Sequence, residues 1–167
     1  MNGWEESLGN LSPVAVAAAQ VASELHKGQK DKGGKDYFTS HLLVVGCHGH
    51  DWKEQTVGFL HDAAEDTPHS VEEVVNAVRR RLSGALPSDD EWNEIKVALN
   101  ILNHHNADSR TAYIQKIKQN RLALRVKLND LRSNMDISRI PHPTSKDFLR
   151  RERYEKEYAE LTKAMNE

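Results

Sequence analysis

Apolar residues recur every three or four positions along most of the chain, the spacing of a helix that buries one face. No segment has the alternating polar and apolar pattern of a half-buried strand. The pattern predicts an all-α helical bundle. The expected helices run from 13 toward 28, around His41 to 48, over 53–66, from 71 to near 84, through 92–102, and over 110–118, 121–134 and 144–164.

Polar residues at the starts and ends of these segments support the helix boundaries. Ser12-Pro13 pairs a capping hydroxyl with a proline at the first helical position. Ser70-Val71-Glu72-Glu73 is a capping-box pattern. Pro141 and Pro143 interrupt the chain before the last helix. We therefore expect one domain over 1–167, with a core at about 12–140 and a terminal helix at about 144–164.

Length and charge narrow the classes of function. The chain has 167 residues and a formal net charge of -2, so we expect neither a second domain nor binding to a nucleic-acid polymer. No stretch approaches 18 consecutive apolar residues, and the segment MNGWEESLGN does not resemble a signal peptide. We expect no membrane association and a cytoplasmic location. Cys47 is the single cysteine, and its apolar surroundings in the sequence predict a core position.

Chemistry is concentrated in the six residues from His61 to Asp66, which contain one imidazole and three carboxylates. On a helix, these polar side chains would cover an arc of roughly 140° beside an apolar flank. Imidazole and carboxylate together are the ligand set for manganese, iron or zinc. His61 and Asp62 are the predicted ligands, and Glu65 and Asp66 lie one turn further on. The alternative is a solvated acidic helix end before Pro68.

Two residues outside this segment favour the metal interpretation. His41 opens an apolar helical run, and Asp130 lies near the end of another. A metal site with an open coordination position needs one or two ligands beyond those of a single helix. We therefore predict a site formed by His41, His61, Asp62 and Asp130.

These residues, in this order, resemble the HD-domain metal-dependent phosphohydrolases. The further Glu65-Asp66 pair resembles the hydrolase domain of RelA/SpoT-type enzymes and the small alarmone hydrolases. The resemblance covers about residues 14 to 140 and extends to three flanking pieces: His26-Lys27-Gly28-Gln29, Tyr37, and Val126-Lys127-Leu128-Asn129-Asp130-Leu131-Arg132-Ser133-Asn134.

The resemblance implies a metal-dependent hydrolase that removes phosphate or pyrophosphate from a nucleotide, most similar to (p)ppGpp pyrophosphohydrolases. It implies manganese, with iron, zinc or magnesium as alternatives. The metal would activate a water molecule and bind a phosphoryl oxygen. Glu65 and Asp66 would then perform the proton transfers, and Tyr37 and Asn134 would contact the substrate. For Asn134 the alternative is an ordinary helix C-cap.

The lysine-rich loop before the first ligand histidine has two interpretations. Lys30 and Lys32 flank Asp31 near two glycines and could hold the phosphates of a nucleotide, or they could be solvated surface residues. Here the chain departs from the family, because Asp31 occupies a position that usually carries arginine. The segment between Tyr37 and His41 is also one residue longer. The departure predicts weaker selectivity for guanine, with a gain in ppGpp hydrolysis on Asp31→Arg.

Three other functions remain open from the sequence. The chain could be an HD-type nucleotidase that acts on nucleoside monophosphates or related phosphorylated metabolites. It could be a non-catalytic module that senses a nucleotide, although such a module would be expected to lose metal ligands. A purely structural protein would leave the clustered carboxylates unexplained. The sequence does not indicate whether the chain self-associates, or whether four further histidines have a role: His48, His50, His104 and His105.

Overall fold

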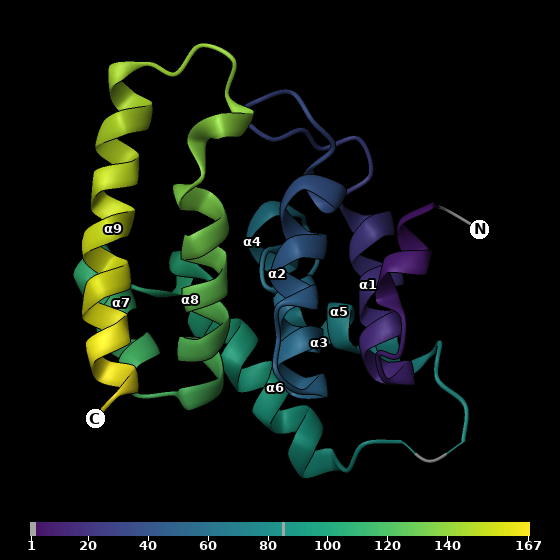
Figure 1. Cartoon of the computed structure of the whole chain (residues 1–167). Coiled ribbons are helices and arrows are strands. Elements are labelled where there is room, and N and C mark those ends of the chain that lie inside the picture. The colour runs from purple at the N-terminus through teal and green to yellow at the C-terminus, as the bar shows by residue number, and fades with distance from the viewer. Residues whose placement is uncertain (1–2, 85) are drawn as a thin grey trace.

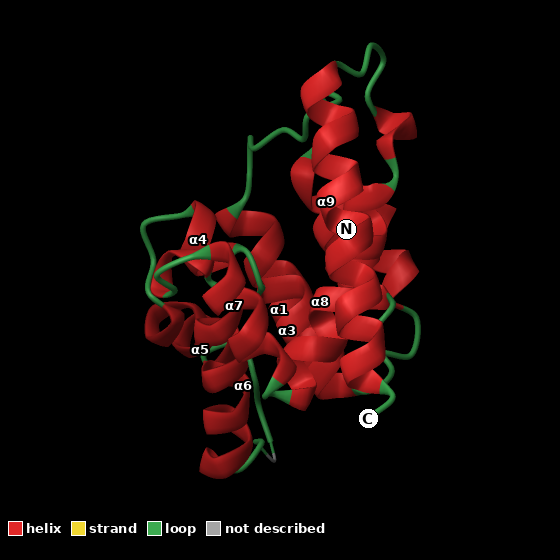
Figure 2. Ribbon diagram, turned by 90° about the vertical axis from the view of Figure 1, so that its left-hand side faces the viewer, coloured by secondary structure: helices red, strands yellow, loops and turns green. Residues whose placement is uncertain are grey.

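Helices are the regular secondary structure of the residues that the computed structural model describes, 3–84 and 86–167. Within those ranges there is no strand, and a single isolated bridge between Lys30 and Asp36 closes the lysine-rich loop (Figure 2). The predicted all-α class is confirmed. Helices α9, α8, α3 and α1 follow one another across the molecule (Figure 1), and each packs against the next.

The N-terminal part supplies α1 and the first ligand helix. A short helix, η1 (Gly3–Leu8), precedes α1 (Pro13–Leu25), which begins as predicted, with the Ser12 side chain accepting from the Ala15 amide. The next helical turn is a π-helix, η2 (Phe38–Leu42), which continues directly into α2 (Leu43–Cys47). A π-turn holds one residue more than an α-turn. The predicted helix around His41 thus begins with a π-turn rather than with regular α-helix.

The predicted helix over 53–66 is broken at its two metal-ligand candidates. α3 (Trp52–Leu60) ends before His61, and α4 (Ala63–Asp66) begins after Asp62. In a continuous helix the Gly58 carbonyl would accept from the Asp62 amide. Here it accepts from His61 Nδ1 at 2.6 Å. The break is slight, because both residues keep right-handed helical dihedral angles. The sequence pattern gave no sign of it.

Two capping boxes start the helices of the middle segment. Ser70 begins α5 (Val71–Arg79) as predicted, and Ser88 begins α6 (Asp89–Leu102) in the same way. The predicted extension of α5 toward Gly84 is wrong, because that helix ends at Arg79. A short turn, η3 (His104–Asn106), follows α6.

The C-terminal part forms the side of the molecule opposite α1. It contains α7 (Arg110–Lys118), α8 (Arg121–Met135), the short turn η4 (Ile137–Arg139) and α9 (Ser145–Met165). α8 packs against both α3 and α9. Arg110 of α7 makes two 2.8 Å hydrogen bonds with the buried Glu157 of α9. α9 is thereby attached to the bundle rather than free of it.

The core is lined by small residues where helices approach most closely. A Cβ at Gly46 of α2 would lie 2.2 Å from the Phe59 ring of α3, and a Cβ at Gly58 would lie 2.9 Å from the Gly46 Cα.

Cys47 does not join this core, contrary to the prediction: its side chain is exposed, because the helix turns it outward. Among the described residues, no helix has the length and apolar character needed to cross a membrane.

Candidate metal centre

Four side chains from three separate segments meet at one point inside the bundle. His41 Nε2 lies 3.0 Å from Asp130 Oδ1 and 3.7 Å from Asp62 Oδ2. His61 Nε2 lies 3.3 Å from each of the same two oxygens. His41, His61 and Asp62 form a group that could hold a metal ion. Asp130 faces both imidazoles, so the structure brings all four predicted ligands together.

The helix breaks described above place these donors. His41 projects from the π-turn, His61 and Asp62 occupy the gap between α3 and α4, and Asp130 comes from α8. His41, His61 and Asp130 are almost fully buried, and the Asp62 side chain is 13% exposed. The cluster thus has a closed side within the core and an open side at Asp62.

Both imidazoles are oriented through their second nitrogen. His61 Nδ1 faces the Gly58 carbonyl, which can only accept, so Nδ1 carries the hydrogen. His41 Nδ1 lies 2.9 Å from Ser133 Oγ. Both Nε2 atoms then point toward the carboxylates, and His41 Nε2 is buried without a hydrogen bond of acceptable geometry. Histidine ligands of metals are held in this way, so the donors fit a bound cation.

Electrostatics at the cluster favour positive charge. Burial opposes a charged imidazole, but the negative charges of Asp62 and Asp130 outweigh it and raise the pKa of His61 to about 10. Burial also opposes the charge on Asp130, yet the Lys127 ammonium at 2.6 Å and the His61 imidazole hold the pKa of Asp130 well below its usual value. A cation at this point would take the place of the His61 proton.

Tyr37 and Asn134 both bond to carboxylates of the cluster. The Tyr37 hydroxyl donates to Asp62 Oδ2 at 2.5 Å, and Asn134 Nδ2 donates to Asp130 Oδ1 at 3.0 Å. Burial and the charge of Asp62 raise the pKa of Tyr37 far above its ordinary value, so the hydroxyl stays a donor. Both residues also line the cavity next to the cluster. Asn134 is not a helix cap, because α8 continues to Met135.

Glu65 and Asp66 lie beside the cluster and face different partners. Asp66 Oδ2 accepts from Gln29 Nε2 at 3.1 Å, and Gln29 Oε1 in turn lies 2.7 Å from His26 Nδ1. Partial burial and the charge of Asp62 raise the pKa of Asp66. Glu65 instead bonds to His104 of η3. Within the described part of the chain, neither carboxylate makes a hydrogen bond to any of the four predicted metal ligands.

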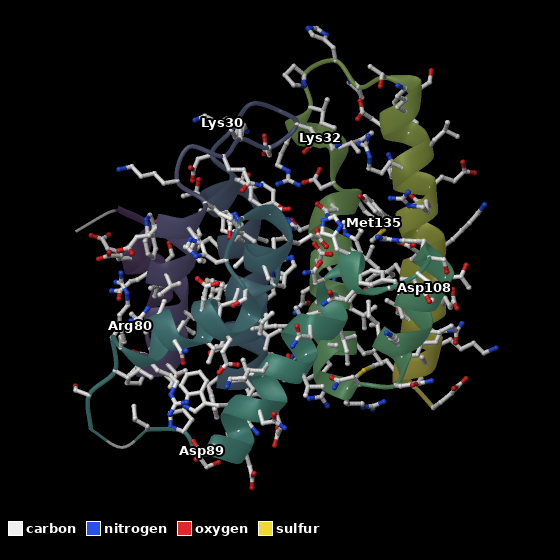
Figure 3. The ribbon with its side chains drawn as sticks, turned by 180° about the vertical axis from the view of Figure 1, so that it is seen from behind. Lys30, Lys32, Arg80, Asp89, Asp108 and Met135 are labelled. Carbon is white, nitrogen blue, oxygen red and sulfur yellow. The ribbon has the colours of Figure 1, made fainter. Side chains whose placement is uncertain are left out.

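A cavity of about 650 Å³ opens over the cluster and has a cationic rim. Lys30 and Lys32 border it from the lysine-rich loop, at the upper end of the molecule (Figure 3). The lining also includes arginines of the segment that contains η4 and α9: Arg139, Arg150, Arg151 and Arg153. The metal cluster thus lies at the closed end of the cavity. The mouth is lined by these cations together with three carboxylates, Asp31, Asp136 and Asp147, and two of the carboxylates pair with Arg139 and Arg150.

Asp31 is part of the architecture of this rim. Its Oδ1 accepts from the Gly33 and Lys35 amides, each at 2.8 Å, and its Oδ2 lies 3.9 Å from Arg139 Nη1. The Gly33 backbone packs against the Arg139 carbonyl so closely that a Cβ would lie 2.0 Å from it. An arginine at 31 would lose both amide bonds. The expected gain from Asp31→Arg is therefore not supported, because the substitution would open the loop.

A scan against protein-family models and a search of curated proteins found no match to this chain. The capability of the site is therefore inferred from its own side chains. They offer two imidazole and two carboxylate donors to a cation, two further carboxylates beside it, and a cationic mouth suited to anions.

Sequence reasoning missed several residues of the site. Lys127 lies three residues before Asp130 on α8, so helical spacing could have indicated that it shares a face with the predicted ligand. The role of Ser133 had no such signal, because it depends on His41 from a distant segment. In the sequence, the arginines of α9 indicate only a charged terminal helix. The folded chain brings them to the cavity.

Proposed function

We propose that the protein is a metal-dependent phosphohydrolase of the HD type that acts on a nucleotide, with a (p)ppGpp-like pyrophosphate ester as the favoured substrate. The observation that carries the proposal is the convergence of two imidazole nitrogens and two carboxylate oxygens, 3.0–3.7 Å apart, below a cavity with a cationic mouth. The order of the motifs in the sequence supports the same assignment.

The donor set fits a divalent ion of the manganese, iron or zinc group. His41, His61, Asp62 and Asp130 would hold it. When bound, the ion would activate a water molecule and withdraw charge from a phosphoryl group. The Gly58 carbonyl keeps the hydrogen of His61 on Nδ1, and the Ser133 hydroxyl holds the orientation of the His41 ring. Manganese is the proposed ion, on the resemblance stated above.

Two carboxylates supply the proton transfers in this proposal. Asp66 has a raised pKa, caused by partial burial and by the charge of Asp62, so it suits the group that gives a proton to the leaving oxygen. Glu65 then takes the proton of the attacking water. The proton count balances, because one is removed from water and one is delivered to the leaving group.

Cations at the cavity mouth support a substrate with several phosphates. Lys32 and Arg153, from distant segments of the chain, both line the cavity, which suits a molecule with negative charge away from the reacting phosphoryl group. A nucleoside monophosphate would leave part of this mouth unused. We therefore rank a nucleotidase second, and a nucleotide sensor without turnover third.

The proposal is tested by metal analysis and a phosphate-release screen. The purified protein, loaded with Mn²⁺, is assayed for phosphate and pyrophosphate release from ppGpp, nucleoside triphosphates and nucleoside monophosphates. We expect pyrophosphate release from ppGpp at the highest kcat/KM. Release only from monophosphates would favour the nucleotidase, and tight nucleotide binding without release would favour the sensor. If the protein neither binds nor hydrolyses any of these nucleotides, the proposal is contradicted.

Variants connect any activity to the cluster. Asp62→Ala should abolish activity and lower metal content, whereas the exposed Asp90→Ala on α6 should leave both unchanged. Asp66→Ala should lower turnover by roughly 10²- to 10⁴-fold while the metal stays bound, the usual worth of general acid-base catalysis. If Asp66→Ala lost as much metal as Asp62→Ala, Asp66 would be a metal ligand instead.

A further inference from the structure

Glu65 is held by a residue that none of the motifs includes. Glu65 Oε1 accepts from the His104 backbone amide at 3.0 Å and lies 2.5 Å from His104 Nδ1. The two residues are 39 positions apart, on α4 and on the η3 turn after α6. Both line the cavity over the metal cluster.

The contact uses one carboxylate oxygen and leaves the other free. Two donors converge on Oε1, which fixes the plane of the carboxylate, and Oε2 has no hydrogen-bond partner among the described residues. A carboxylate accepts through both oxygens, so Oε2 retains its full capacity to accept a proton. The Glu65 side chain is only 17% exposed and lines the cavity.

His104 is itself held in place. The Asn103 side chain caps the η3 turn through the His105 amide, at 3.1 Å, and the His104 ring lies 4.2 Å from the His105 ring and 6.3 Å from the buried Tyr113 ring, centroid to centroid. His104 Nδ1 is thus presented to Glu65 by a turn with its own hydrogen bonds. This arrangement resembles the pairing of a catalytic base with a residue that orients it.

We infer that His104 is a positioning residue for Glu65: its amide and imidazole hold Oε1, so that Oε2 faces the cavity as the base in hydrolysis. The inference rests on the proposed function, since it assigns a partner to the base of that reaction. In this role the Nδ1 hydrogen stays on His104, and the proton taken from water goes to Glu65 Oε2. Misplacing a catalytic group by about 1 Å costs up to about 100-fold in rate.

Kinetic variants test the role. His104→Ala should lower kcat by about 10- to 100-fold with KM and metal content unchanged, because the base loses its orientation while the substrate and metal keep their contacts. His104→Asn should restore most of kcat, since the asparagine amide places a donor near the position of Nδ1. His69→Ala is the control, because it removes an exposed imidazole that neither lines the cavity nor contacts His104 or Glu65.

A double variant separates positioning from a general structural effect. In a Glu65→Ala background, adding His104→Ala should cost nothing further, because the group that His104 orients is already gone. An undiminished loss in that background would overturn the inference. So would wild-type kcat in His104→Ala, or a change in KM alone, which would make His104 a substrate contact.

A spectroscopic measurement tests the contact without activity. In the zinc-loaded protein, imidazole ¹⁵N shifts should identify His104 with its hydrogen on Nδ1, and Glu65→Ala should move the hydrogen to Nε2. An Nε2–H form in the wild type would overturn the inference. Failure of the proposed function would look different: the wild type would release phosphate from no nucleotide, whatever residue 104 is.

Discussion

At the scale of single residues, the centre is organised by groups that do not face the metal position themselves. The Gly58 carbonyl and the Ser133 hydroxyl face the Nδ1 atoms of His61 and His41, and Lys127 and Tyr37 bond to Asp130 and Asp62. The contacts of Gly58, Ser133 and Lys127 leave a nitrogen or oxygen of the inner residue turned toward the common point. Tyr37 instead bonds to the Asp62 oxygen that itself faces the two imidazoles. The inner four alone would not keep this arrangement, because the carboxylates repel each other.

Ser133→Ala tests the outer contacts. Without its hydroxyl, His41 Nδ1 has no partner, and both the tautomer and the ring orientation are free to change. We expect Mn²⁺ affinity to fall by about 10- to 100-fold, the usual effect of losing such a partner. Isothermal titration with Mn²⁺ measures this, with Ser23→Ala on α1 as the control. Equal affinity in the two variants would show that Ser133 does not orient the ligand.

The four predicted metal ligands could be identified from the sequence because each is an imidazole or a carboxylate next to an apolar helical segment. His41, His61, Asp62 and Asp130 were all expected, and they do meet. The Glu65–His104 pair was not, since a contact across 39 residues leaves no local pattern. The part that Asp31 plays in holding two backbone amides was not predicted either, because it depends on how the loop folds.

At the scale of helices and loops, the site depends on departures from regular helix. The π-turn η2 and the break between α3 and α4 turn His41 and His61 toward α8. Apolar periodicity predicted the helices well, because burial of one face is what stabilises them. It did not predict either departure, since each results from contacts with other segments and leaves the apolar stripe intact.

Gly46→Ala tests the close packing that supports these departures. The new methyl group would overlap the Phe59 ring, and overpacking of this kind costs about 1–3 kcal/mol. At about 2–4 °C per kcal/mol for a chain of this size, the melting temperature should fall by several degrees. Gly3→Ala is the control, because its Cβ meets nothing within 4 Å. Equal melting temperatures would contradict the packing described.

The cavity rim should loosen in acid. Asp31, Asp136 and Asp147 accept hydrogen bonds that stabilise the turns of the rim. Burial raises the pKa of Asp31, but backbone hydrogen bonds outweigh it and lower that pKa. Hydrogen bonds from Ser138 and Thr144 lower the pKa of Asp136 and Asp147. A carboxylate with a lowered pKa in the folded state stabilises the fold above its unfolded-state pKa of 3.8.

That stabilisation is lost as the pH falls below 3.8 and through the lower folded-state values. Hydrogen-exchange protection of residues 31–36 and 136–147 should therefore decrease between about pH 4 and pH 2 more than protection of α1 does. Equal changes in the rim and in α1 would indicate global unfolding rather than loosening of these turns.

At the scale of the whole molecule, the metal position lies where the two sides of the bundle meet. The α1–α3 side contributes His61 and Asp62, and the α8–α9 side contributes Asp130 (Figure 1). A ligand that bridges two sides binds the folded state and not the unfolded chain, so it stabilises the fold. Metal binding and fold stability are thus expected to be coupled.

Chelation should lower the melting temperature. At a metal concentration 100 times Kd the stabilisation is about 2.7 kcal/mol, which corresponds to roughly 5–10 °C for a chain of this length. Thermal denaturation with Mn²⁺ and with a chelator measures the difference. His61→Ala should abolish the shift, and the exposed His69→Ala should retain it. A shift that persists in His61→Ala would place the stabilising metal elsewhere.

The central claim is that one metal ion binds among His41, His61, Asp62 and Asp130. Anomalous diffraction from crystals grown with Mn²⁺ tests it most directly, because the signal locates the ion without reference to activity. The account predicts one strong peak at about 2.0–2.3 Å from both imidazole Nε2 atoms. No peak between these four residues, or a stronger peak at His48, His50 or His105, would contradict it.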